Sequence, residues 1–254
     1  FFAGEHPDVA TEKTLKDRKA LCGGYAVLFK ELCQQAGVKA VIVPGKTKGH
    51  GYIEGDTSTT GLHGWNSIKL DDEWHLVDAT WGAGALQDKK FVKEFHDFYF
   101  MPPPEALVFT HFPRKANCQL LTEPISEKEF DRQPKVSGRF FEVGVTPSAI
   151  RKALAAEDFP GLVKIYDTPG SSFVLKEAPL TGSLKPGTKY HFRIETADFP
   201  AVIVSNGGRN FALARKGKHF EGTIVAPRGT IKVQGVIGEG RKIIIWDLLE
   251  YKAE

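Results

Sequence analysis

Two strand-like runs separated by only two residues are the feature that most restricts how this chain can fold. The runs are HGWNSIKL, residues 63–70, and EWHLVDATW, residues 73–81, and Asp71-Asp72 lies between them. A connection of two residues between strand-forming runs is typical of a β-hairpin. The sequence therefore predicts that these two runs pair as antiparallel strands.

The length of this turn decides which side chains share a face of the hairpin. With two residues in the turn, Trp65 lies opposite Asp78, and His63 lies opposite Thr80. Because side chains alternate between the two faces, His63 and Asp78 point to the same face as diagonal neighbours, with Cα atoms about 7–8 Å apart. An imidazole and a carboxylate can bridge that distance with a hydrogen bond. A three-residue turn would put them on opposite faces, so this prediction depends on an even loop.

A cysteine at the start of a predicted helix can join this pair. The segment KALCGGYAVLF, residues 19–29, places Cys22 directly before two glycines and an apolar run with helical spacing. A thiolate at a helix N-terminus meets free N–H groups and the positive end of the helix dipole, and both lower the pKa of a thiol. If His63 takes the thiol proton and Asp78 fixes the imidazole tautomer, the three side chains can carry out covalent acyl transfer.

Each of these residues also has a simpler structural role available. A lone cysteine on an apolar helix is more often a small buried hydrophobe, a lone histidine is more often satisfied or exposed than a base, and an aspartate can cap a turn. Cys33 lies on the apolar face inside the same helix, so we predict that it belongs to the core. Three cysteines without paired spacing argue against a disulfide framework.

Taken together, these segments resemble the transglutaminase-like core, whose superfamily includes transglutaminases, peptide N-glycanases and cysteine peptidases. LCGGYAVLFKELCQQAGVKAVIVPG and GLHGWNSIKLDDEWHLVDATWG contain, in order, a cysteine that opens a helix, an H-x-W-N strand and a D-x-T-W strand end. The matching positions are Cys22, then His63, Trp65 and Asn66, then Asp78, Thr80 and Trp81. The resemblance covers roughly residues 8–84, and it implies a papain-like fold with a Cys22–His63–Asp78 catalytic triad.

A second resemblance extends further along the chain. EFHDFYFMPPPEALVFTHFP, with CQLL after it, is similar to the segment after the catalytic core in the kyphoscoliosis peptidase family, where β-sandwich modules come next. One feature departs from the superfamily, in which a Trp or Gln side chain upstream of the cysteine helps the cysteine N–H to bind the oxyanion. Residues 1–21 contain neither. Loss of one such donor can cost about 10²–10³ in rate, so either the donor precedes this sequence or another group replaces it.

The character of the sequence changes near Pro134. Before it, S-x-x-E at Ser126 predicts a last short helix with a capping box. After it, short strand-like runs between Gly/Pro turns are typical of a β-sandwich, with one short helix opened by Thr146. We therefore expect an α+β chain of two domains: a transglutaminase-like catalytic domain over residues 1–134 and an all-β, immunoglobulin-like sandwich over residues 135–254.

Composition and charge argue against several classes of function. The chain of 254 residues has a net charge of +3, and no Lys/Arg stripe is interleaved with aromatic residues, so no nucleic-acid surface is expected. No apolar run approaches the roughly 18 residues of a membrane helix. The histidines lack metal-ligand spacing, so neither a metal nor a cofactor is expected. No signal peptide is visible and the first residue is Phe1, so we expect a truncated or processed N-terminus, and the compartment stays open.

The sequence thus predicts a cysteine-dependent acyl-transfer enzyme that acts on peptide or glutamine carboxamide carbonyls through a thioester. If water resolves the thioester, the enzyme is a peptidase or deamidase, and if an amine does, it is a transglutaminase. The resemblance to kyphoscoliosis peptidases favours hydrolysis. The alternative is a catalytically weak or inactive module whose β-sandwich binds a protein partner.

Overall fold

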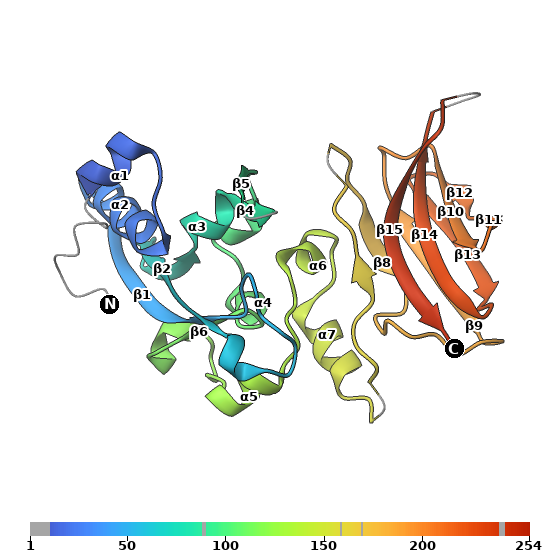
Figure 1. Cartoon of the computed structure of the whole chain (residues 1–254), viewed down its shortest axis with the longest axis horizontal. Helices are drawn as coiled ribbons and strands as arrows, with labels where there is room; N and C mark the ends of the chain where they lie inside the picture. The colour runs from blue at the N-terminus through green and yellow to red at the C-terminus, as the bar shows by residue number, and fades with distance from the viewer. Residues whose placement is uncertain (1–10, 88–89, 158, 169, 239–241) are drawn as a thin grey trace. The chain divides into compact units, whose positions relative to one another are not determined.

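The first half of the chain contains most of the helices and a four-stranded sheet, and a five-stranded and a four-stranded sheet make up most of the second half (Figure 1). The computed structural model describes residues 11–87, 90–157, 159–168, 170–238 and 242–254. The chain divides into two compact units, Phe1–Gly138 and Arg139–Glu254. The predicted boundary, between residues 134 and 135, lies close to this division, and that each unit is an independent domain remains a prediction.

An antiparallel sheet in the order β3-β2-β1-β6 forms the centre of the first unit. Its strands are β1 (Lys39–Thr47), β2 (Gly61–Leu70), β3 (Glu73–Val77) and β6 (His111–Pro113). Helix α2 (Cys22–Gln35) packs against β1 and β2. The buried side-chain amide of Asn66, on β2, donates to the main-chain oxygen of Ala26 at 3.0 Å. This hydrogen bond ties the helix to the sheet and fixes where α2 begins relative to β2.

Short elements surround this sheet. They are α1 (Thr11–Asp17), η2 (Thr57–Thr59), α3 (Ala79–Gly82), β4 (Gly84–Gln87), β5 (Lys90–Lys93), η3 (Asp97–Tyr99), α4 (Pro104–Leu107), η4 (Ala116–Gln119) and α5 (Glu127–Arg132). The side chains of Ser126 and Glu129 form the predicted capping box at the start of α5. Among the described residues, no helix combines the length and the apolar character needed to cross a membrane.

The β2–β3 hairpin has the register that a two-residue turn predicts. Asp71 and Asp72 have φ angles of 47° and 65°, the left-handed conformation that tight hairpin turns require and that aspartate tolerates. Pairing then runs without a shift as far as Asn66 and Val77. The even loop on which the predicted site depends is therefore present.

One part of the hairpin prediction was wrong, because the second strand is shorter than expected. β3 ends at Val77, so Thr80 does not pair with His63 and instead belongs to α3. The side chain of Asp78 accepts hydrogen bonds from the N–H groups of Thr80 and Trp81. An aspartate at this position favours a helix start over a continued strand, since it satisfies N–H groups that a helix leaves free.

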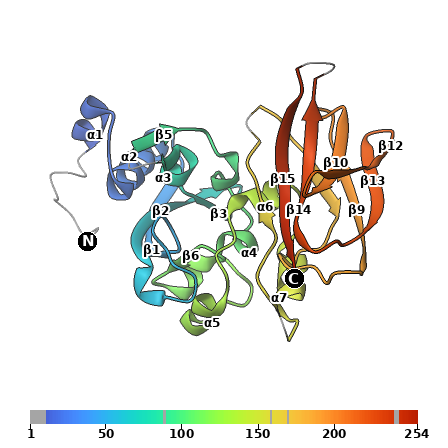
Figure 2. The same cartoon turned by 45° about the vertical axis from the view of Figure 1, so that its right-hand side comes forward.

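Two antiparallel sheets make up most of the second unit (Figure 2). One has the order β11-β10-β14-β15-β7 and the other β12-β13-β9-β8. The strands are β7 (Lys164–Ile165), β8 (Val174–Glu177), β9 (Lys189–Glu195), β10 (Ala201–Asn206), β11 (Arg209–Ala212), β12 (Ala214–Lys216), β13 (His219–Val225), β14 (Gly229–Ile237) and β15 (Ile244–Ala253). The buried rings of Phe192 and Tyr251, one from each sheet, lie 5.8 Å apart, so the sheets pack face to face. An immunoglobulin-like topology remains a prediction.

One run of the second half that was expected to be a strand is a helix. Two helices, α6 (Gly138–Glu142) and α7 (Pro147–Leu154), precede β7. The predicted cap at Thr146 does open α7, since its hydroxyl accepts from the N–H of Ala149. The α6 segment, GRFFE, had the composition of a strand. Its residue Phe140 and the residue directly after the helix, Val143, are both buried and lie three positions apart, however, which suits a helical turn and not an alternating strand.

Candidate active site

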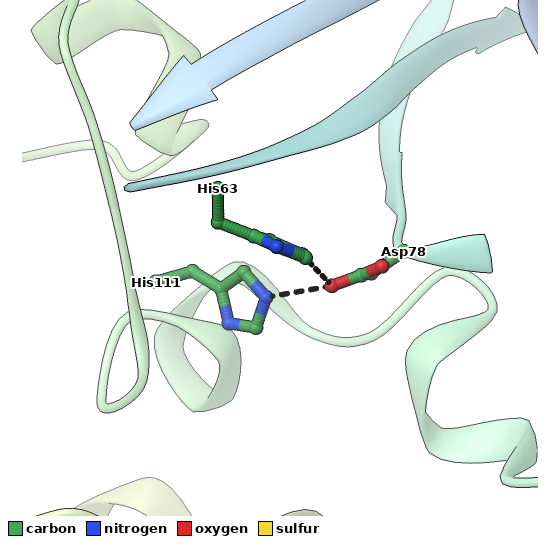
Figure 3. A group of neighbouring side chains, drawn as sticks. All are labelled: His63, Asp78 and His111. Carbon is green, nitrogen blue, oxygen red and sulfur yellow. Dashed lines mark hydrogen bonds and ion pairs between the residues drawn. The ribbon is translucent and has the colours of Figure 1, made fainter. Parts of the chain in front are cut away.

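His63 and Asp78 meet at the end of the hairpin away from its turn. Nε2 of His63 lies 2.7 Å from Oδ2 of Asp78, and both side chains are buried (Figure 3). The second carboxylate oxygen, Oδ1, accepts from the N–H groups of Thr80 at 2.9 Å and Trp81 at 3.1 Å. Asp78 therefore caps the N-terminus of α3 with Oδ1 and binds His63 with Oδ2. Its orienting role in a reaction remains a prediction.

A second histidine binds the same carboxylate oxygen. Nε2 of His111, the first residue of β6, lies 3.0 Å from Oδ2 of Asp78, so both imidazoles point at one atom (Figure 3). The Nδ1 atom of His111 lies 2.8 Å from the hydroxyl of Thr110. Sequence reasoning missed this residue. No local pattern marks it, because its position follows from the pairing of His111 with Thr47 across β6 and β1.

Aromatic rings surround the two imidazoles. His63 stacks on Trp65 with ring centroids 6.1 Å apart and planes 23° apart. The ring of His111 meets Trp81 at 4.6 Å and Trp65 at 5.0 Å, edge to face in both cases. Gly45 leaves space for Trp65, since a Cβ atom there would lie 2.5 Å from the indole. These apolar walls keep water away, which strengthens the charge interactions between the enclosed groups.

Cys22 is the first residue of α2, half-buried beside His63. Burial acts to raise the pKa of its thiol, but the hydrogen bond to the His63 side chain, the charge of that ring and main-chain groups of Gly64 and Gly23 outweigh it and lower the pKa. β2 pairs with β3 only from Asn66 onward, so the strand edge at Gly64 is open to the sulfur. His63 and Asp78 are joined by a direct hydrogen bond, and the electrostatic effect of His63 reaches the Cys22 thiol. That the three side chains act as a catalytic triad remains a prediction.

The other two cysteines lack such surroundings. Cys33 packs against a small core cluster that contains Ala40 and Ile68, in agreement with its predicted core role. Burial raises the pKa of its thiol, with no cation to oppose it. Cys118 lies beside a second cluster that contains Trp65. The lowered thiol pKa at Cys22 is therefore a property of its position.

The two histidines differ in pKa, so they differ in protonation near neutral pH. Burial acts to lower the pKa of His63, but its hydrogen bonds to Asp78 and Cys22 outweigh this and raise the pKa to about 9. Burial acts to raise the pKa of Asp78, but the hydrogen bonds from His111 and His63 hold it well below its usual range. Burial lowers the pKa of His111 despite the nearby carboxylate. Near neutral pH, His63 is therefore charged and His111 is neutral.

Two histidines and an aspartate in one place can also bind a metal ion. The nearest ligand atoms of His63, Asp78 and His111 all lie within 4.8 Å of one another. A zinc ion would need all three to surround one point at about 2.0–2.2 Å from each. Here both ring nitrogens instead point at Oδ2 of Asp78 at hydrogen-bonding distance. Hydrogen bonding accounts for the arrangement, and the absence of a metal remains a prediction.

The sequence is similar to one superfamily of proteins. The family model of the Transglutaminase-like superfamily matches residues 3–79. This stretch contains Cys22, His63 and Asp78, and it ends where α3 begins. The resemblance to the transglutaminase-like superfamily that the three motifs predicted is therefore confirmed over these residues.

Individual proteins similar to this chain point to one family within the superfamily. Kyphoscoliosis peptidase of Mus musculus is 39% identical over 134 residues, which are 52% of this chain and 20% of that protein. The Homo sapiens protein of the same name is 38% identical over 134 residues, with the same two shares. Lim and transglutaminase domain protein ltd-1 of Caenorhabditis elegans is 33% identical over 135 residues, 48% of this chain and 19% of that protein. The chain spans about a fifth of the length of these relatives, and the predicted resemblance to kyphoscoliosis peptidases is confirmed.

Proposed function

We propose that this chain is a cysteine-dependent acyl-transfer enzyme that acts on peptide or glutamine carboxamide carbonyls through a thioester. The observation that carries the proposal is the 2.7 Å contact between His63 and Asp78, enclosed by aromatic rings beside the thiol of Cys22. The superfamily match supports it. The name of the mouse and human relatives says that those proteins are peptidases.

In this mechanism Cys22 is the nucleophile and His63 transfers protons. The thiolate adds to the carbonyl carbon, the C–N bond breaks, and the His63 imidazolium gives its proton to the departing amine or ammonia. A thioester on Cys22 remains. Neutral His63 then takes a proton from water as the water attacks the thioester, and the acid product leaves. Attack by a primary amine gives transamidation instead, and in both halves Asp78 holds the imidazole in place and balances its charge.

Main-chain N–H groups near Cys22 are the donors assigned to the oxyanion. The first N–H groups of a helix have no acceptor within the helix, and α2 begins at Cys22. Main-chain groups of Gly23 and Gly64 already act on the sulfur. These N–H groups lie beside the sulfur and can bind the oxyanion, whether or not a side chain upstream of the sequence joins them.

The proposal is tested by alkylation of the full chain with iodoacetamide at about pH 6, with labelled peptides identified by mass. An activated thiolate reacts at this pH, whereas an ordinary thiol with a pKa of about 8.5 scarcely does. Cys33 and Cys118 are internal controls, since all three thiols are partly exposed. We expect label on Cys22 well before the other two. Equally slow labelling of all three would overturn the proposal.

The type of reaction is decided by incubation with a glutamine-containing peptide, with and without a primary amine, and then mass analysis. A shift of about +1 Da indicates deamidation, a larger adduct indicates transamidation, and fragments indicate proteolysis. The control is Cys22→Ala, which removes the nucleophile and leaves α2 with a residue that favours helix. Product formation by this variant would exclude Cys22 as the nucleophile.

A second candidate function is a catalytically weak module that binds a protein partner through its second unit. Ile243, Ile244 and Ile245 favour it, because all three side chains are at least half exposed at the start of β15. Contiguous exposed apolar residues often mark interaction sites. A folded chain whose Cys22 is inert towards iodoacetamide would favour this candidate over the enzyme.

A further inference from the structure

We propose that His111 is a positioning residue for the proposed reaction, because it binds Oδ2 of Asp78 and so fixes the carboxylate that orients His63. The inference rests on the proposed function, since it concerns the same site. It adds a member that the three sequence motifs do not contain: His111 lies beyond the residues matched by the superfamily model, which end at 79. Thr110 supports it from the other side of the ring.

His111 is held from several directions and cannot meet a substrate from solvent. It is only 2% exposed. Its Nε2 atom lies 3.0 Å from Oδ2 of Asp78, its Nδ1 atom lies 2.8 Å from Oγ1 of Thr110, and its ring packs between Trp65 and Trp81. A side chain so placed can act on the reaction only through Asp78, so it positions the catalytic residues and does not react itself.

The hydroxyl of Thr110 sets the tautomer of His111. The partner of Nε2 is a carboxylate, which only accepts hydrogen bonds when it is ionised, so Nε2 must carry a proton. In a neutral imidazole Nδ1 is then an acceptor, and Thr110 must donate to it. The alternative acceptor for this hydroxyl, the main-chain oxygen of Leu107, is farther away at 3.2 Å. The chain of hydrogen bonds thus runs from Thr110 through His111 to Asp78.

Two imidazoles share one carboxylate, and they are not equivalent. The ionisable groups that face His111 are Asp78 at the start of α3, His63 on β2 and, at 6.3 Å, the ring of Tyr99 in η3. His63 also meets the thiol of Cys22, whereas the outer nitrogen of His111 meets a neutral hydroxyl. His63 is therefore the ring that becomes charged. Because His111 also donates to Oδ2, it weakens the hydrogen bond between Asp78 and the protonated His63 ring.

A matched pair of variants tests this role. His111→Phe fills the space without a donor, and His111→Gln keeps an N–H group at a similar reach. The readouts are the dependence of acyl transfer and of Cys22 alkylation on pH, from about pH 5 to 10, and thermal melting. For His111→Phe we expect a loss of about 10–100-fold in acyl transfer. The alkaline limb of the acyl-transfer profile should move to higher pH, since His63 is then the sole ring donor to Oδ2. His111→Gln is expected to restore the profile and most of the rate.

A second pair guards against a variant that fails to fold. Thr110→Val removes the hydroxyl at nearly the same volume, and Thr110→Ser keeps it. We expect the valine variant to shift the pH profile in the same direction as His111→Phe, and the serine variant to match the wild type. A wild-type profile and rate in both His111→Phe and Thr110→Val would overturn the role of His111 alone. Ordinary thiol behaviour of Cys22 in the wild type would overturn the proposed function, and this inference with it.

Discussion

The two units bury different kinds of side chain. In the first unit Lys48, His63, Asp78 and His111 are all buried, whereas the buried polar residues among those described in the second unit are two threonines. Burying an ionised group without compensation costs several kcal/mol or more. The second unit avoids this cost with a core of aliphatic and aromatic side chains. The first unit contains such groups near Cys22 and, at Lys48, directly after β1.

Each buried charge in the first unit is offset by several hydrogen bonds. Asp78 accepts four, and the ammonium group of Lys48 donates to the main-chain oxygens of Phe130 and Gln133. In the second unit, ion pairs such as Lys232–Asp247 are partly exposed, where a pair contributes about 0–1 kcal/mol. Buried charge in this chain is therefore accompanied by several hydrogen bonds, whereas partly exposed charge is held by fewer contacts.

Among the variants that test this difference between the two units, Asp78→Asn is expected to have the largest effect. The amide would present a donor where the N–H groups of His63 and His111 need an acceptor. The equivalent change in a serine triad costs about 10⁴ in turnover, and because a thiol depends less on its base we expect a loss of about 10²–10³. Stability is expected to fall by about 1–3 kcal/mol, because buried donors lose their acceptor. Acyl-transfer rates and thermal melts measure the two effects.

The control for this variant is Asp247→Asn in the second unit, which weakens a partly exposed ion pair. It is expected to leave the rate unchanged and to lower stability by less than about 1 kcal/mol. If Asp78→Asn instead keeps the wild-type alkylation profile but melts many degrees lower, Asp78 is only the cap of α3. The contrast between the two units would then concern stability alone.

A bell-shaped dependence on pH is the next largest effect. Activity should rise as the Cys22 thiol ionises, since its pKa is lowered, and fall about tenfold per unit above about pH 9, where His63 loses the proton needed by the leaving group. Because the pKa of His63 is raised from 6.5 to about 9 by folding, its contribution to stability is complete below pH 6.5 and is lost as the pH rises to 9. Activity that stays level up to pH 10 would contradict this assignment.

A smaller effect is expected from Ile231→Val, which removes one methylene from the core of the second unit. Ile231 is fully buried, so the change should lower the free energy of unfolding by about 0.5–1.5 kcal/mol. The rate of Cys22 alkylation should stay the same. Denaturant titration and labelling of the same sample measure both quantities. A shifted alkylation profile would show that the core of the second unit affects the reactivity of Cys22. The two units would then not differ in function as expected.

The smallest effect is expected from a metal chelator. Hydrogen bonds account for the positions of His63, Asp78 and His111, so EDTA should move the melting temperature by less than about 1 °C. A protein whose fold depends on a structural metal loses much of its stability on chelation. A fall of several degrees would mean that these buried groups hold a metal, and that their charge is balanced in a different way.

Sequence reasoning succeeded where local rules decide the structure. The hairpin register follows from the length of one turn, and the helix start at Cys22 follows from apolar spacing. It failed where one interaction overrides another: Asp78 ends a strand-like run because it caps α3, and GRFFE forms α6 because of the side chains that it buries. His111 stayed hidden because it reaches Asp78 through pairing between strands far apart in the sequence.

The Asp71-Asp72 turn has a consequence for how this gene can vary. Exposed turns usually accept insertions and deletions over evolutionary time, and both aspartates are exposed. Here the gain or loss of a single codon would slip the hairpin by one residue and send alternate side chains to the opposite face. Selection on the contact between His63 and Asp78 would therefore act on the number of residues in the turn at the other end of the hairpin. Identity at these two positions can drift among residues that accept a left-handed backbone, such as Asn and Gly, while length cannot.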